Sequence, residues 1–229
     1  MDEDAYPELQ LPLSALSHSR VGSIVTVQSQ GEEYRGRIID VQKGIAFVQL
    51  FERLSLPSES DLSVTLIQAL PKKEKMELII QKATELGVTA IIPCASERSI
   101  TLAEREARQT KAHRWAAIAA KAVEQSRRRL APEVKQCVGF PTALEMASDS
   151  QLKIILYERE VDHSLRDFSG KMFRSLAIAA GPEGGFTEDE VALAQKHGYV
   201  PVRLGGRILR CETASIAAIS IAQFLWGDL

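Results

Sequence analysis

The sequence predicts an α/β protein in which a mostly parallel sheet, with helices on both faces, follows a small all-β barrel. Two observations support this fold class. Up to Leu70 the chain contains short β-branched-rich segments separated by turn signals, and from Pro71 onward nearly continuous apolar strands alternate with helices. We therefore place a boundary near Leu70, which divides the chain into domains of residues 1–68 and 69–229.

The first domain is expected to be a barrel or sandwich of short strands. Turn signals at Gln30-Gly31, Lys43-Gly44 and Pro57-Ser58 separate segments with high β propensity. The strands predicted in this way are 21–28, 34–41, 45–51 and 63–70.

The second domain alternates helices with buried strands. A helix from about Lys73 to Leu86 ends at Gly87, and Thr187 with Glu190 forms a capping box that begins a later helix. The last helix is apolar on nearly every face, which predicts a subunit interface. The other predicted elements are strands at 90–94, 153–157, 175–180 and 199–204 and helices at 103–130, 187–198 and 214–226.

Composition narrows the class of protein. Hydrophobic residues make up 45% of the chain and charged residues 25%, which is typical of a globular protein, and the net charge of −2 says nothing about RNA binding. The three cysteines (Cys94, Cys137 and Cys211) are far apart, so no disulfide framework or metal site is expected. The start of the chain is acidic and no apolar run reaches the roughly 20 residues that span a bilayer, so we expect a cytoplasmic protein without membrane contact.

Two loops that follow buried strands are the candidate ligand site. Residues 181–186 (Gly-Pro-Glu-Gly-Gly-Phe) allow a backbone to approach a flat ligand closely, although a plain strand-to-helix turn is an equally good interpretation of this loop taken alone. Residues 204–214 interleave apolar side chains, which could line an adenine pocket, with Arg207 and Arg210. Ligands of open α/β sheets bind beyond the carboxyl ends of strands, where both loops are expected. Neither loop is a dinucleotide or phosphate-loop motif.

Several motifs in this order resemble those of the RsmE-type ribosomal RNA methyltransferases, which belong to the SPOUT superfamily. The paired signature is Gly181 to Phe186 followed by Leu204-Gly205, Arg207 to Arg210 and Glu212 to Ala214. Further similar segments are 71–73 with 76–77, 82–88, 97–99 and 124–128, so that the resemblance covers about residues 63–229.

The resemblance implies an S-adenosylmethionine-dependent methyltransferase that modifies uridine N3 in the 16S RNA of the small ribosomal subunit. It also implies a SPOUT fold with a trefoil knot, a PUA-like RNA-binding barrel and a homodimer with the final helix at its interface, with no metal. The cofactor would lie against residues of three loops: Leu156, Tyr157, Glu158, Gly181, Pro182, Glu183, Gly184, Leu204, Gly205, Ile208, Leu209, Arg210, Thr213 and Ala214.

Methylation of N3 requires removal of a proton from a neutral ring nitrogen. The family motif makes Arg210 the first candidate for stabilising the uridine anion. Glu212 is a possible base or an orienter of Arg210, and an acid at a helix N-terminus is an equally good interpretation. Cys211 is better explained as a small buried side chain than as a nucleophile.

Basic residues suggest where RNA would bind. The candidates are Lys72, Lys73, Lys75, Arg98, Arg127, Arg128 and Arg129. For the arginine run, interaction with the C-terminal dipole of a helix is an equally good explanation.

Two other functions are compatible with the sequence. One is a SPOUT methyltransferase with a different RNA target, because fold and cofactor pocket do not identify the nucleotide. The other is a non-catalytic RNA-binding relative, because the chain carries Leu16-Ser17-His18-Ser19-Arg20 where family members usually have a His and a Val-Leu-Arg motif.

Overall fold

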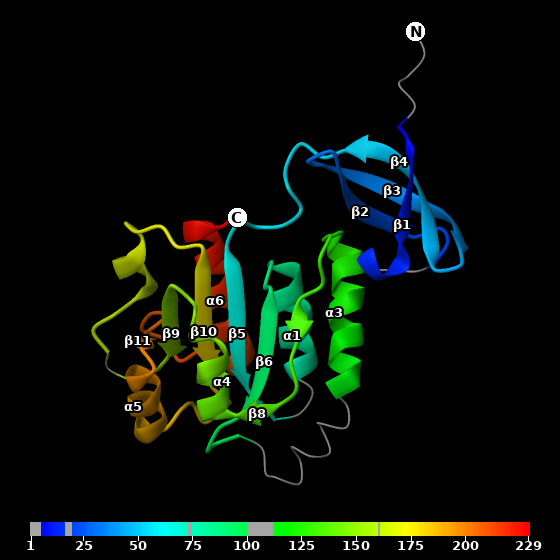
Figure 1. Ribbon diagram of the computed structural model, residues 1–229. Helices are drawn as coiled ribbons and strands as arrows, with labels where there is room; N and C mark the ends of the chain where they lie inside the picture. Colours follow the sequence, from blue (N-terminus) through cyan, green and yellow to red (C-terminus); the bar gives the residue numbers. More distant parts are fainter. Residues whose placement is uncertain (1–5, 17–19, 73–74, 100–111, 160) are drawn as a thin grey trace. The chain divides into compact units, whose positions relative to one another are not determined.

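The protein folds into two compact units. A computed structural model describes residues 6–16, 20–72, 75–99, 112–159 and 161–229 (Figure 1). The first unit contains residues 1–59 and 120–131, and the second contains 60–119 and 132–229. Lys73, the segment 17–19 and most of the residues expected to begin the helix at 103–130 lie outside the described residues.

The first unit is built on an antiparallel four-stranded sheet. Its strands are β1 (Glu8–Pro12), β2 (Ile24–Ser29), β3 (Glu32–Gln42) and β4 (Ile45–Arg53), in the order β1-β4-β3-β2, and a short 3-10 helix η1 (Leu13–Ala15) follows β1. Alternate residues point to one side, where Val25, Ile38 and Val48 are buried in a small core. Three of the predicted strands are confirmed, and β1 was not predicted.

The second unit contains a parallel sheet, as the sequence predicts. Its strands run in the order β11-β9-β10-β5-β6-β7, and β8 also pairs with β6. Every strand pair in this sheet is parallel. The strands are β5 (Ser63–Ala69), β6 (Ala90–Ala95), β7 (Glu133–Val134), β8 (Val138–Gly139), β9 (Leu152–Leu156), β10 (Ser175–Ala180) and β11 (Val200–Val202).

The assignment of residues 63–70 to the first domain is wrong. Strand β5 lies between β10 and β6 in the middle of the parallel sheet, and the two units divide after Glu59 rather than after residue 68. Its burial explains the error, because a strand covered on both faces is nearly continuous in apolar residues and does not alternate. Strand β5 also follows three antiparallel strands directly in the sequence, which favoured its assignment as a fourth strand of the same sheet.

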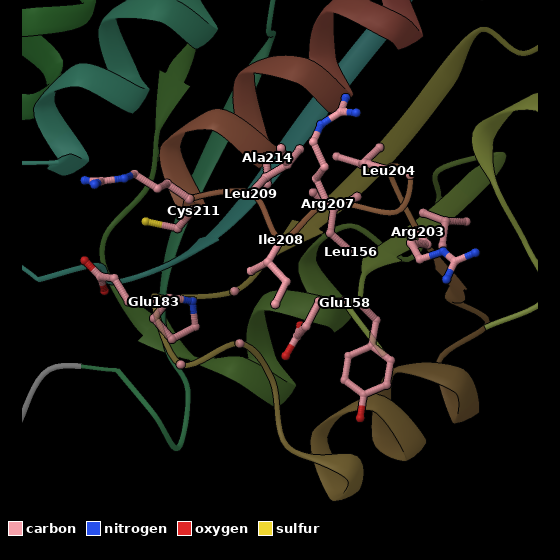
Figure 2. Close-up of a pocket in the computed structure, with 18 of the residues that line it drawn as sticks. Leu156, Glu158, Glu183, Arg203, Leu204, Arg207, Ile208, Leu209, Cys211 and Ala214 are labelled. Atoms are coloured by element: carbon pink, nitrogen blue, oxygen red, sulfur yellow. The ribbon is translucent and has the colours of Figure 1, made fainter. Parts of the chain in front are cut away.

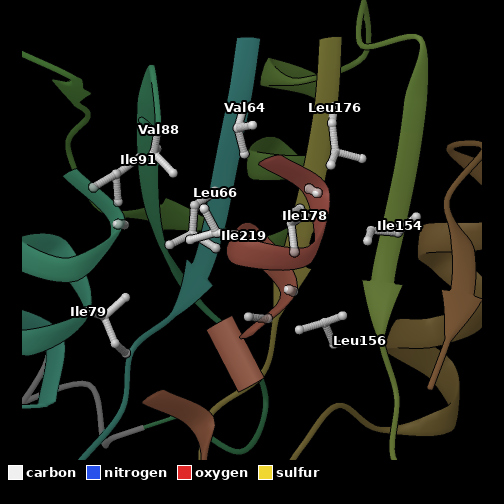
Figure 3. Packing of buried hydrophobic residues seen from close by; sticks show 14 of the residues in the cluster. Val64, Leu66, Ile79, Val88, Ile91, Ile154, Leu156, Leu176, Ile178 and Ile219 are labelled. Atoms are coloured by element: carbon white, nitrogen blue, oxygen red, sulfur yellow. The ribbon is translucent and has the colours of Figure 1, made fainter. Parts of the chain in front are cut away.

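Helices cover both faces of the parallel sheet. Val64 and Leu66 of β5 belong to a core that includes residues of α1 (Lys75–Glu85) and α6 (Cys211–Trp226), and Figure 3 shows Leu66 close to Ile219. Ile67 and Ala69 belong to the opposite core, with residues of α4 (Phe140–Met146) and α5 (Glu188–Lys196). The other helical elements are α3 (Ala112–Ser126) and the 3-10 helix η2 (Leu165–Phe168).

The last helix is not buried on every side. It contacts α1, β10 and β5 through residues that include Ser215, Ala218 and Gln223, whereas Phe224 is 73% exposed. It also begins at Cys211, three residues earlier than predicted. None of the helices in the described ranges is long and apolar enough to cross a membrane.

Shortening Leu66 to Ala should destabilise the second unit specifically. Leu66 is fully buried on the central strand, so we expect a loss of about 2–5 kcal/mol in its free energy of unfolding. Both tryptophans, Trp115 and Trp226, lie in this unit, so urea unfolding followed by tryptophan fluorescence reports on it. Met172→Ala is the control, because Met172 is 83% exposed. Equal stability of the two variants would contradict the central position of β5.

Candidate functional site

A pocket of about 530 Å³ lies at the carboxyl ends of β9, β10 and β11. Figure 2 shows side chains of the three following loops arranged around it. Every residue predicted to contact a cofactor lines this pocket except Thr213, which is exposed outside it. Lining residues outside the three loops that the sequence suggested are Lys75, Val202 and Arg203.

The wall formed by residues 181–185 has a fixed shape. The N–H of Gly185 donates to the carbonyl of Pro182 at 3.0 Å, and Gly185 has a φ of +66°. A Cβ atom on Gly185 would lie 2.7 Å from a carboxylate oxygen of Glu158, so a larger residue would collide with the neighbouring wall. The predicted capping box of Thr187 and Glu190 then begins α5, which holds the far end of this loop.

Arg98 supports the same wall from outside. Its Nη1 donates to the carbonyl of Gly184 at 2.8 Å, and a Cβ on Gly184 would lie 3.2 Å from the Arg98 side chain. Arg98 is an exposed residue beside the pocket loop. The structure therefore gives this residue a supporting contact in addition to the RNA contact that the sequence predicts.

A buried polar contact through Gln68 of β5 links the start of α6 to the end of β10. The hydroxyl of Ser215 in α6 donates to Oε1 of Gln68 at 2.6 Å, and Nε2 of Gln68 lies 3.4 Å from the carbonyls of Ala180 and Gly181. Both side chains are fully buried. Gln68 thus fixes the start of α6 relative to the end of β10. A buried glutamine within an apolar strand is the signal in the sequence that could have identified it.

A cluster of charges lies at one side of the pocket. Nζ of Lys75 lies 3.1 Å from a carboxylate oxygen of Glu183 and 3.1 Å from one of Glu212. Glu183 also accepts hydrogen bonds from the backbone N–H of Lys72, at 3.1 and 3.0 Å. Lys75 was predicted to face RNA, and the structure instead places it between these two carboxylates.

The cluster stays ionised at neutral pH. Desolvation raises the pKa of Glu212, but hydrogen bonds from its own backbone N–H, from Cys211 and from Lys75 outweigh this effect and hold the pKa below its usual value. Desolvation also raises the pKa of Glu183, but hydrogen bonds from the backbone N–H of Lys72, from its own backbone and from Lys75 outweigh this effect, so that the pKa lies below its usual value. For Lys75, desolvation lowers the pKa, and the bonds to Glu212 and Glu183 raise it above its usual value. All three groups therefore carry their charges.

This arrangement argues against two of the catalytic roles considered for the second loop. Glu212 is a weak base, because its carboxylate is stabilised by Lys75 and by the thiol of Cys211 at 3.2 Å. Burial, together with the hydrogen bond to Glu212, raises the pKa of Cys211 to about 12, so the sulfur is a neutral thiol and a poor nucleophile.

Arginines supply the positive charge on the opposite loop. Arg210 is the residue before α6, its side chain is exposed, and its carbonyl accepts the N–H of Ala214 at 2.8 Å. Arg203 and Arg207 line the same pocket. A guanidinium keeps its positive charge at neutral pH and offers five N–H donors.

The arginine run after α3 is only partly available to RNA. Arg128 is buried, and its Nη2 lies 2.7 Å from Glu59, while Arg129 pairs with Glu33 at 3.0 Å. The prediction of Arg128 as an RNA contact is therefore wrong, because its guanidinium stabilises the fold of the first unit. Arg127 and Lys72 remain exposed.

Metal ligands are not gathered at this site. In the ranges that the structure describes, no group of three or more histidine, cysteine, aspartate or glutamate side chains could hold a metal ion.

Comparisons with known proteins identify the family. The family model described as an RNA methyltransferase domain matches residues 58–223. Ribosomal RNA small subunit methyltransferase E of Buchnera aphidicola is 34% identical over 84% of this chain and 75% of its own length. The protein of the same name from Bacillus subtilis is 33% identical over 88% of this chain and 81% of its own.

A solved structure gives the same result for the fold. The crystal structure of a ribosomal RNA small subunit methyltransferase E from Neisseria gonorrhoeae bound to S-adenosyl methionine superposes with a TM-score of 0.75. It is 33% identical, and the match covers all of this chain and 96% of the other. The three-loop pocket, the matching family model and these relatives agree, and the chain belongs to the ribosomal RNA small subunit methyltransferase E family.

Proposed function

We propose that this protein is an S-adenosylmethionine-dependent methyltransferase that methylates N3 of a uridine in the 16S RNA of the small ribosomal subunit. The observation that carries the proposal is the pocket that the loops after β9, β10 and β11 form together, since the loops after β10 and β11 carry the paired family motif. The relative from Neisseria gonorrhoeae, whose fold superposes on this chain, binds S-adenosyl methionine. Because the proposed substrate is ribosomal RNA, we expect the enzyme to act in the cytoplasm.

The residues of the pocket fit this cofactor. Its volume lies within the usual range for small-molecule sites, of about 300–1,000 Å³. Leu156, Leu209 and Ala214 offer apolar surface for an adenine ring, and the backbone of residues 181–185 can approach a flat ligand closely. The carboxylate of Glu158 can attract positively charged groups. When bound, the cofactor supplies an activated methyl group on a positively charged sulfur.

The protein's own residues make uridine N3 a nucleophile. Transfer of the N3 proton to solvent water leaves negative charge shared between N3 and the two carbonyl oxygens beside it. The guanidinium of Arg210 can donate to these atoms, which lowers the free energy of the anion in the transition state. Glu212 is not assigned as the base, because Lys75 already neutralises its carboxylate. Orientation of the two reactants contributes the rest of the rate enhancement.

The proposal also covers the knot in the second unit, the RNA-binding role of the first unit and the assembly of two copies of the chain. We assign the second unit to the knotted SPOUT fold and the first to a PUA-like RNA-binding barrel that acts together with Lys72, Arg98 and Arg127. We further propose a homodimer in which the exposed apolar side chains of α6, Phe224 and Ile221, pack against a second copy. Such side chains, at 73% and 37% exposed, are costly to leave in water.

Replacement of Arg210 by Ala should abolish most of the activity. Removal of one transition-state donor costs roughly 10²–10³-fold in kcat. Transfer of labelled methyl groups to assembled small subunits, with naked RNA as the comparison, measures this, and mapping of the product identifies the base. Arg166→Ala, on an exposed residue of η2, is the matched control and should retain activity. Normal activity of Arg210→Ala would remove this residue from the mechanism, and a product other than N3-methyluridine would indicate another specificity.

Replacement of Gly185 by Ala should weaken cofactor binding by about tenfold or more, because φ +66° is strained for a residue with a Cβ and because this Cβ, 2.7 Å from the Glu158 carboxylate, would displace a side chain that lines the pocket. Calorimetric titration with S-adenosylmethionine tests this. Gly170→Ala is the control, since its Cβ would meet nothing within 4 Å. If the unmodified protein bound no cofactor, a non-catalytic RNA-binding relative would be the better interpretation.

Replacement of Phe224 by Asp should convert the dimer to a monomer, because a buried carboxylate would disrupt an apolar interface. Sedimentation velocity measures the change. Leu56→Asp places the same charge at a residue of the first unit that is 77% exposed, and should leave the dimer intact. A monomeric unmodified protein would refute the proposed assembly.

A further inference from the structure

Lys75 has a position that the proposed chemistry does not use. It is the first residue of α1, and its ammonium group lies between carboxylates from two different pocket loops. Glu183 belongs to the loop after β10, and Glu212 belongs to the first turn of α6, directly after the loop that follows β11. Three segments that are far apart in the sequence therefore meet at one nitrogen atom.

The loop before α6 needs such an anchor. A Cβ added at Gly205 or Gly206 would meet no atom within 4 Å, and Ile208 is 87% exposed, so the middle of this loop makes few packing contacts. Its position is set at its two ends. One end is β11, and the other is the start of α6, where Gln68 holds Ser215 and Lys75 holds Glu212.

Glu183 is anchored equally well on the opposite side. It accepts the Lys72 N–H with both carboxylate oxygens and the Lys75 ammonium with one of them. Without the ammonium, Glu183 and Glu212 would face each other as like charges, since both carboxylates lie 3.1 Å from the same nitrogen. Loss of Lys75 would therefore convert an attraction between the two walls into a repulsion.

We propose that Lys75 is a positioning residue that joins the two walls of the cofactor pocket by its simultaneous ion pairs with Glu183 and Glu212. In this role it acts through the two carboxylates and not on the cofactor or the uridine. It sets the separation of the loops before ligand binds, and this preorganisation favours binding. The inference rests on the proposed function in so far as the ligand of the pocket is S-adenosylmethionine.

The first test measures the unliganded protein and does not depend on the ligand. In Lys75→Met, amide hydrogen exchange of residues 204–214 should be about tenfold faster than in the unmodified protein. Lys82→Gln is the matched control, because it removes an ion pair with Glu85 from the same helix, outside the residues that line the pocket. Unchanged exchange in Lys75→Met would refute the joining role, whether or not the protein is a methyltransferase.

The second test separates positioning from direct contact. For Lys75→Met, the Kd and KM for S-adenosylmethionine should rise about tenfold while kcat at saturating cofactor changes less than about threefold. Lys75→Arg should restore part of the affinity, which also guards against a general folding defect. An unchanged KM with a reduced kcat would overturn the proposal, because it would place Lys75 at the reacting groups.

A third test introduces Lys75→Met into a protein that already carries two substitutions. When Glu183→Gln and Glu212→Gln are already present, Lys75→Met should have little further effect on cofactor affinity, because the partners through which it acts are gone. A full tenfold loss in that background would show direct contact with the ligand and refute positioning. Failure of the unmodified protein to bind S-adenosylmethionine would instead refute the proposed function, and the exchange experiment would still decide the role of Lys75.

Discussion

The pocket depends on the parallel alignment of β9, β10 and β11. Ile155 of β9 lies opposite Ala179 of β10 on one side and opposite Pro201 of β11 on the other. All three strands run in the same direction, so their following loops leave the sheet at the same level. An antiparallel partner in any of these positions would carry its loop to the other edge, and the site would not exist. The register of three short strands is thus the constraint on which the chemistry rests.

Once the loops are brought together, polar contacts determine their spacing. Glycine-rich loops bury little apolar surface, so packing alone cannot fix them. Gln68 satisfies carbonyl groups at the end of β10 with its amide nitrogen and binds Ser215 of α6 with its oxygen. Arg98 supports Gly184 from outside the pocket. Because these groups lose a partner if one wall moves, each contact penalises displacement of a loop.

Much of the fold and the pocket could be predicted from the sequence, because both follow from local patterns. The buried strand at 175–180 and the capping box at Thr187 were predicted from local signals alone, and the structure confirms both. Strand β5 was assigned to the wrong domain because pairing of distant segments is not encoded in a local apolar pattern. The roles of Lys75 and Arg128 were missed for a related reason. Whether a basic side chain faces solvent or a carboxylate depends on segments more than fifty residues away.

The distribution of charge in the pocket favours catalysis by anion stabilisation over catalysis by a carboxylate base. A base must gain a proton during the reaction, and Glu212 would lose its attraction to Lys75 on doing so. An arginine has no such conflict, since it stays charged throughout and its interaction strengthens as negative charge develops on the uridine. Glu183 and Glu212, neutralised by Lys75, then serve to hold the walls of the pocket. Two kinds of charge in one pocket therefore have separate tasks. In the proposed mechanism, paired charges fix the shape of the pocket, and the exposed guanidinium groups act on the substrate.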